Sequence, residues 1–146
     1  MTKPRVWWVV AAGVLALAAS ARAQESTSDW IKRILDPAAI GVKPFPDSQL
    51  NRKITVDTIH LADPSKRIAI YMAPLDKMQA VSDYFTESLG VKPTVTDPGT
   101  PHERHLFDLI GAGTYPPAAQ GLTIEIIRSP WVDGKTQITM EMTVKK

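Results

Sequence analysis

The clearest pattern in the chain is a series of apolar residues spaced three or four apart across residues 76–89, which predicts an amphipathic helix. Asp76 is expected to cap its start, with Gln79 completing a capping box. Gly90 is placed to end the helix in the left-handed conformation. Ser82 is assigned to the solvent side with the other polar residues. The expected buried face comprises Met78, Val81, Phe85 and Leu89.

Strand patterns follow the helix. Residues 136–144 alternate between apolar and polar side chains, which is typical of a half-buried antiparallel strand. Residues 122–128 and 103–110 alternate less regularly. Asp133 and Gly134 predict a tight hairpin turn between the last two strands.

Two further segments before the helix have strand character. Residues 68–73 form a largely apolar run, which is typical of a central strand. Residues 53–61 change phase near Asp57, and we interpret them as a strand with a bulge. Packing an antiparallel sheet of about five strands against the capped helix is the simplest way to bury both apolar sides. The predicted fold is therefore α+β.

The first 23 residues have the features of a secretory signal peptide. Lys3 and Arg5 precede the uncharged residues 6–19, and residues 21–23 have the small-x-small pattern that signal peptidase recognises. Residues 19–21 fit the same rule, so cleavage two residues earlier is an alternative. An uncleaved anchor is the competing interpretation, but the apolar run is shorter than the roughly 20 residues of a spanning helix.

The remaining chain divides into two parts at most. Residues 24–36 form an N-terminal segment with a short helix near Trp30, which ends before Pro37. Residues 37–146 contain all the strands and the main helix, and we expect them to fold as one domain. The expected localisation is the periplasm or the extracellular space, with no stable membrane anchor after the signal peptide is removed.

Composition narrows the possible partners. Removing Lys3, Arg5 and Arg22 with the signal leaves 14 of the 17 basic residues against 15 acidic ones, a net charge of −1. The basic residues do not form a long stripe, so a nucleic-acid partner is not expected. The chain has no cysteine, which excludes disulfides and a lipid-modified cysteine.

The order of three segments, a Pro-rich segment, a strand and a helix, resembles that of a known class of proteins. The segment GVKPFP at residues 41–46 is followed by a strand that ends at Ala73, and then by a helix in which Val81 precedes Tyr84 and Phe85. This order resembles small exported bacterial proteins of unknown function. The resemblance covers about residues 41–89 and implies the fold and the compartment, with no catalytic residue.

A cluster of histidines is the strongest candidate for metal chemistry. His102, Glu103 and His105 lie within four residues, and His60 could be a third histidine ligand. The spacing does not match the helical metalloprotease motif. A loop at His102 and a strand from His105 would send alternate side chains to opposite faces. Solvated loop histidines are the competing interpretation, and we expect no cofactor.

Two aromatic residues in loops are candidates for ligand binding. Trp131 lies in the last hairpin, and Tyr115 precedes two prolines. Either ring could stack on a sugar or a Pro-rich peptide, or fold back over the sheet edge. The two loops flank residues 122–128 at opposite ends, roughly 20 Å apart. We therefore expect one loop to carry the site, and the short hairpin favours Trp131.

These observations lead to two functional hypotheses. The first is an exported, non-catalytic domain of the cell envelope that binds a protein, peptide or small molecule or has a structural role. The second is a metal-assisted hydrolase that uses His102, Glu103 and His105. Stoichiometric zinc lost on replacing both histidines would favour the second.

Overall fold

The computed structural model describes residues 27–144. The chain divides between Lys32 and Arg33 into two units, and each is described by itself. The first unit carries the short helix α2, Thr27–Ile31. The predicted signal peptide, residues 1–23, lies outside the described residues. Within the described range, no helix combines the length and the apolar character needed to span a membrane.

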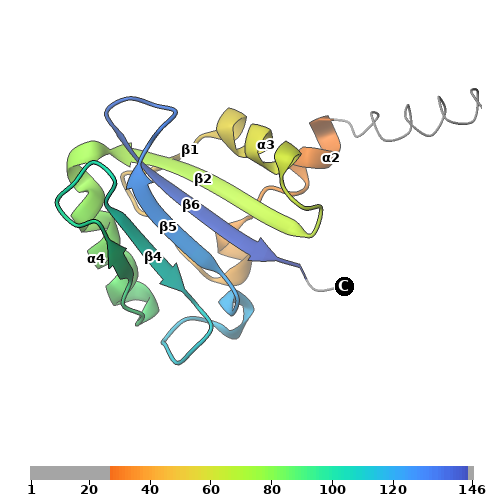
Figure 1. The fold of residues 1–146 in the computed structure, drawn as a ribbon. Helices are drawn as coiled ribbons and strands as arrows, with labels where there is room; N and C mark the ends of the chain where they lie inside the picture. Colours follow the sequence, from red (N-terminus) through yellow and green to blue (C-terminus); the bar gives the residue numbers. More distant parts are fainter. Residues whose placement is uncertain (1–26, 145–146) are drawn as a thin grey trace, which may run out of the picture. The chain divides into compact units, whose positions relative to one another are not determined.

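One six-stranded sheet forms the centre of the second unit. Its strands are β1 Gln49–Leu50, β2 Lys66–Pro74, β3 Thr94–Thr96, β4 Arg104–Asp108, β5 Thr123–Arg128 and β6 Lys135–Thr143. They pair antiparallel in the order β1-β2-β6-β5-β4-β3 (Figure 1). This confirms the α+β single domain, with six strands instead of about five. The short edge strands β1 and β3 were not predicted.

The main helix, α4 Met78–Leu89, supplies one side of the hydrophobic core. Val81 and Phe85 are fully buried and Leu89 nearly so, which confirms the predicted face. They pack with strand residues that point to the same side of the sheet. These strand residues include Ala69, Ala73, Phe107, Ile124, Ile126, Ile138 and Met140.

The ends of α4 were predicted with mixed success. Gly90 ends the helix with φ +65°, and its N–H donates to the Thr86 carbonyl, as expected. The predicted cap at Asp76 was wrong, because the 3-10 turn η2 Leu75–Lys77 precedes the helix and places Lys77 at the N-cap. Ser82 was also wrongly assigned to solvent, since it is only 2% exposed.

Residues 53–61, predicted as a strand, instead belong to the helix α3 Arg52–Leu61. Asn51 caps this helix through its side-chain oxygen, which accepts from the Ile54 N–H at 3.0 Å. Thr55 and Ile59, four residues apart, are the buried positions of the helix. The Thr55 hydroxyl accepts from the N–H of Ile70 at 3.0 Å. The helix thereby satisfies part of the β2 edge that β1 leaves unpaired.

Helices α3 and α4 lie on opposite faces of the sheet (Figure 1). Side chains alternate along β2, so Ile70 and Met72 point away from the α4 side, to which Ala69 and Ala73 contribute. The α3 side of the sheet is largely polar on β5 and β6, where Glu125 and Thr139 lie half-buried. Two further 3-10 turns are η1 Pro37–Ile40 and η3 Pro117–Ala119.

Candidate functional site

A groove of about 610 Å³ lies between α3 and the open face of the sheet. Its volume is within the range of roughly 300–1,000 Å³ that is usual for small-molecule sites. The helix forms one wall, strands β2 and β6 form the floor, and the β5–β6 hairpin contributes Trp131. The lining residues are Lys53, Ile54, Asp57, Thr58, Leu61, Ile70, Trp131, Gln137 and Thr139.

Two large apolar side chains at this groove are exposed to solvent. Trp131 is 71% exposed and Leu61 is 86% exposed, although both residue types are usually covered. Ile54 on α3 and Ile70 on the floor extend the apolar surface between them. The groove therefore offers an aromatic ring and an aliphatic surface to a ligand that has an apolar face.

The hairpin that carries Trp131 is held in place by Ser129. The Ser129 hydroxyl accepts from the backbone N–H of Trp131 at 3.2 Å and of Val132 at 3.0 Å. It donates to the side-chain oxygen of Gln137 at 3.1 Å, and the Gln137 amide donates to Thr139 at 3.3 Å. This chain of hydrogen bonds joins the loop to the groove floor. The backbone at Trp131 is thus already ordered before a ligand is bound, which would reduce the entropic cost of binding.

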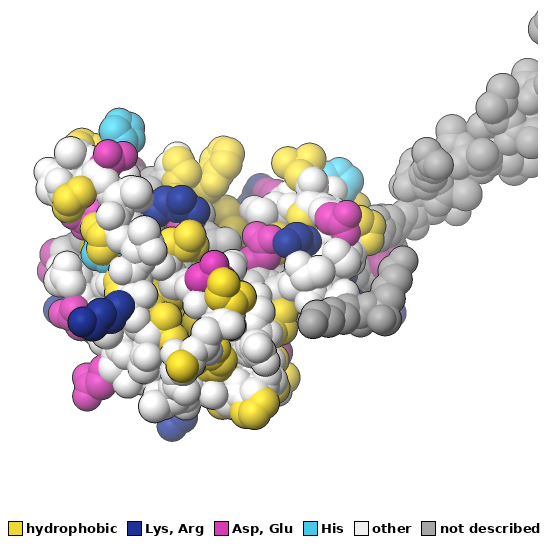
Figure 2. Space-filling view, turned by 60° about the horizontal axis from the view of Figure 1, so that its bottom comes forward, with side chains coloured by type: hydrophobic (Ala, Val, Ile, Leu, Met, Phe, Trp, Pro, Cys, Tyr) yellow, Lys and Arg dark blue, Asp and Glu magenta, His cyan; other side chains and the backbone are white. Residues whose placement is uncertain are grey.

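The charged groups of the groove are balanced. Lys53 and Asp57 lie one turn apart on α3, with their charged atoms 2.7 Å apart. Both side chains are largely exposed, so their hydrogen-bonding groups can also turn to a ligand. One cation and one anion among the lining residues favour a ligand without net charge. Figure 2 shows the same mixing more widely, with basic side chains scattered among acidic and uncharged ones.

Tyr115, the second predicted aromatic residue, has a different environment. It is half-buried and packs against the hydrophobic core. Its hydroxyl donates to the Gly111 carbonyl within the same loop. The ring therefore folds back over the core, whereas Trp131 lines a groove. This contrast favours Trp131, and its role in binding stays a prediction.

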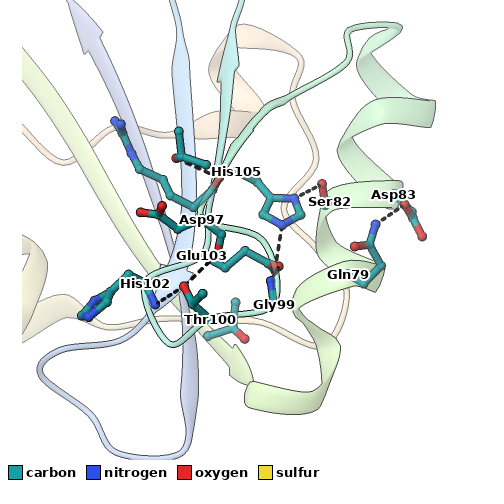
Figure 3. A network of polar contacts seen from close by, with 12 residues as sticks. Gln79, Ser82, Asp83, Asp97, Gly99, Thr100, His102, Glu103 and His105 are labelled. Carbon is teal, nitrogen blue, oxygen red and sulfur yellow. Dashed lines mark hydrogen bonds and ion pairs between the residues drawn. The ribbon is translucent and has the colours of Figure 1, made fainter.

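The three histidines are placed in three different settings. His105 on β4 is buried, while His102 is exposed in the preceding loop and its ring points away from His105 (Figure 3). His60 lies on the exposed side of α3. Within residues 27–144, no group of three or more His, Cys, Asp or Glu residues is arranged to hold a metal ion.

The His105 ring instead joins β4 to α4. Its Nδ1 lies 2.7 Å from the Ser82 hydroxyl and its Nε2 lies 3.0 Å from a carboxylate oxygen of Glu103 (Figure 3). The Gly99 N–H, at 2.8 Å, and the His105 ring hold the pKa of Glu103 below its ordinary value. Glu103 is therefore a carboxylate at neutral pH and can only accept. Nε2 carries a hydrogen, and in the neutral ring Nδ1 accepts from Ser82.

The residue types of this network match those of a Ser-His-acid triad, but its surroundings do not. Ser82 is only 2% exposed and lies within α4, so a substrate cannot reach its hydroxyl. Ser82 is the fifth residue of α4, where the backbone N–H donates to the carbonyl one turn earlier and is not free to bind an oxyanion. The network therefore acts as a buried polar contact between helix and sheet.

No family model, curated protein or solved structure matches this chain. The resemblance to small exported bacterial proteins accordingly stays a prediction. Sequence reasoning identified Trp131 but missed the rest of the groove. The wall residues Ile54, Thr58 and Leu61 were hidden by the interpretation of residues 53–61 as a strand. The role of Ser129 could have been predicted, because a serine hydroxyl often hydrogen-bonds to the backbone two residues later in a turn.

Proposed function

We propose that the protein is an exported, non-catalytic domain of the cell envelope that binds a small, uncharged ligand in the groove beneath Trp131. The observation that carries the proposal is an exposed tryptophan on a hydrogen-bonded hairpin beside a groove of ligand size. A flat apolar face of the ligand would stack on the indole ring. Polar groups of Thr58, Gln137 and Thr139 would orient it.

The contacts of His105 favour this proposal over the metal-assisted hydrolase. A metal ligand needs a ring nitrogen with a free lone pair. Both ring nitrogens of His105 already have protein partners, and the ring is 3% exposed. Recruiting His105 to a metal would break a buried hydrogen bond, which is costly.

Replacing Trp131 with alanine is expected to weaken ligand binding at least tenfold, or about 1.4 kcal/mol, because aromatic anchors dominate binding energy. Isothermal titration calorimetry with neutral mono- and oligosaccharides and with a Pro-rich peptide measures this without relying on tryptophan fluorescence. Tyr115→Ala serves as the control, since Tyr115 lies outside the groove. Binding that persists in Trp131→Ala but is lost in Tyr115→Ala would reverse the assignment.

The proposed export of the protein leads to a separate prediction. The basic start, the short apolar run and residues 21–23 support cleavage after Ala23. Mass spectrometry of the protein from its native host should find Gln24 at the amino terminus, or Arg22 if the alternative site is used. An intact Met1 form in the membrane fraction would contradict the exported, soluble form of the proposal.

A further inference from the structure

A second hollow adjoins the groove on the same side of β2. Its volume is about 600 Å³, close to that of the groove beneath Trp131. Trp131 lines the groove and the next residue, Val132, lines the second hollow. Ile70 and Met72 likewise line one each, and they are neighbours on one face of β2. The two hollows therefore follow one another along the strand, and we call them together the cleft.

The second hollow is more polar than the groove. Asp47, Gln49 and Lys135 contribute exposed polar side chains to it. Its lining again contains one acidic and one basic residue, as the groove does. The whole cleft is thus charge-balanced, with an apolar and aromatic part beside a part rich in hydrogen-bonding groups. A neutral ligand with many hydroxyl groups and apolar ring faces matches both parts.

An extended peptide fits the cleft less well. Peptides that lie along a sheet are usually held by main-chain hydrogen bonds to a free strand edge. Here β1 pairs with Tyr71 and Met72, and the Asn51 N–H donates to the Ile70 carbonyl at 2.8 Å. Thr55 accepts from the Ile70 N–H. The β2 edge along the cleft is therefore already occupied by the protein's own chain.

We infer that the cleft is one site for a neutral, linear oligosaccharide, with one sugar unit on Trp131 and the next in the hollow of Gln49 and Lys135. This inference rests on the proposed function and adds the ligand class and its direction of extension. Two adjoining hollows of similar volume suit a ligand made of repeating units. The amide of Gln49 and the ammonium group of Lys135 can bind hydroxyls of the second unit.

The test compares ligands of different length. Calorimetry is carried out on the full mature protein with the mono-, di- and tetrasaccharides of β-linked glucose and of β-linked N-acetylglucosamine. The expected result is that one series gains at least tenfold in affinity from monosaccharide to tetrasaccharide. The double variant Gln49→Ala, Lys135→Ala should remove this gain, so that the tetrasaccharide binds no tighter than the monosaccharide.

Matched controls separate the possible failures. Lys92→Ala with Gln120→Ala removes the same residue types from exposed positions outside the cleft and should keep the gain. Equal affinities for all lengths would overturn the two-part site while leaving the groove beneath Trp131 in place. Trp131-dependent binding of the Pro-rich peptide alone would overturn the oligosaccharide class. If no saccharide or peptide binds, both this inference and the proposed function are overturned.

Discussion

Replacing Phe85 with alanine is expected to lower the free energy of unfolding by about 3–5 kcal/mol, which is typical for removing a phenylalanine from a core. Phe85 is fully buried at the middle of α4. Its ring makes edge-on contacts with Tyr84, at a centroid distance of 5.1 Å, and with Phe107, at 6.0 Å. Alanine would remove these contacts and leave a cavity between the helix and β4.

Urea denaturation followed by circular dichroism measures this loss. Glu87→Ala is the matched control, because Glu87 is exposed on the same helix. Its effect should stay within about 0.5 kcal/mol. If both substitutions had similar effects, the face of α4 that packs on the sheet would have been assigned incorrectly.

The core could be predicted because its signals are local and periodic. Val81, Phe85 and Leu89 recur at helical spacing, and residues 136–144 alternate at strand spacing. The structure confirms the buried helix face and, on β6, the burial of Ile138 and Met140. Gln137, on the opposite side of β6, is buried as well, and Val144 is exposed. The edge strands β1 and β3 could not be found this way, because they are two and three residues long and exposed.

The helix α3 could not be predicted because local preference and tertiary contact disagree. Ile54, Thr55 and Ile59 are β-branched, and such residues favour strands when judged alone. The helix forms around a capping Asn51 and a Thr55 side chain that hydrogen-bonds to β2. The second of these contacts spans 15 residues. Because α3 forms one wall of the groove, the groove could not be foreseen either.

The candidate residues show the same limit. Trp131 could be singled out from its position in a short hairpin, and the groove beside it gives that position a physical meaning. His105 was grouped with His102 because the two are close in sequence. Its actual partner on α4, Ser82, is 23 residues away, so no local pattern could reveal it. A polar residue on an otherwise buried face is more often explained by a hydrogen bond to a residue distant in sequence than by a metal site.

Replacing His105 with leucine is expected to cost about 1–3 kcal/mol of unfolding free energy, because the buried hydroxyl of Ser82 would lose its partner. Ser82→Ala should cost a similar amount, since Nδ1 of His105 would then be buried without a partner. The double variant should cost at least about 1 kcal/mol less than the sum of the two, because removing both polar groups leaves neither unsatisfied.

Urea denaturation of the wild type, both single variants and the double variant gives this coupling energy directly. His102→Leu is the control and should change stability by less than about 0.5 kcal/mol, because its ring is exposed in the loop. Additive effects of the two single substitutions would show that Ser82 and His105 do not share a hydrogen bond. An unchanged stability in His105→Leu would instead place the ring outside the core and reopen its assignment as a ligand or catalytic group.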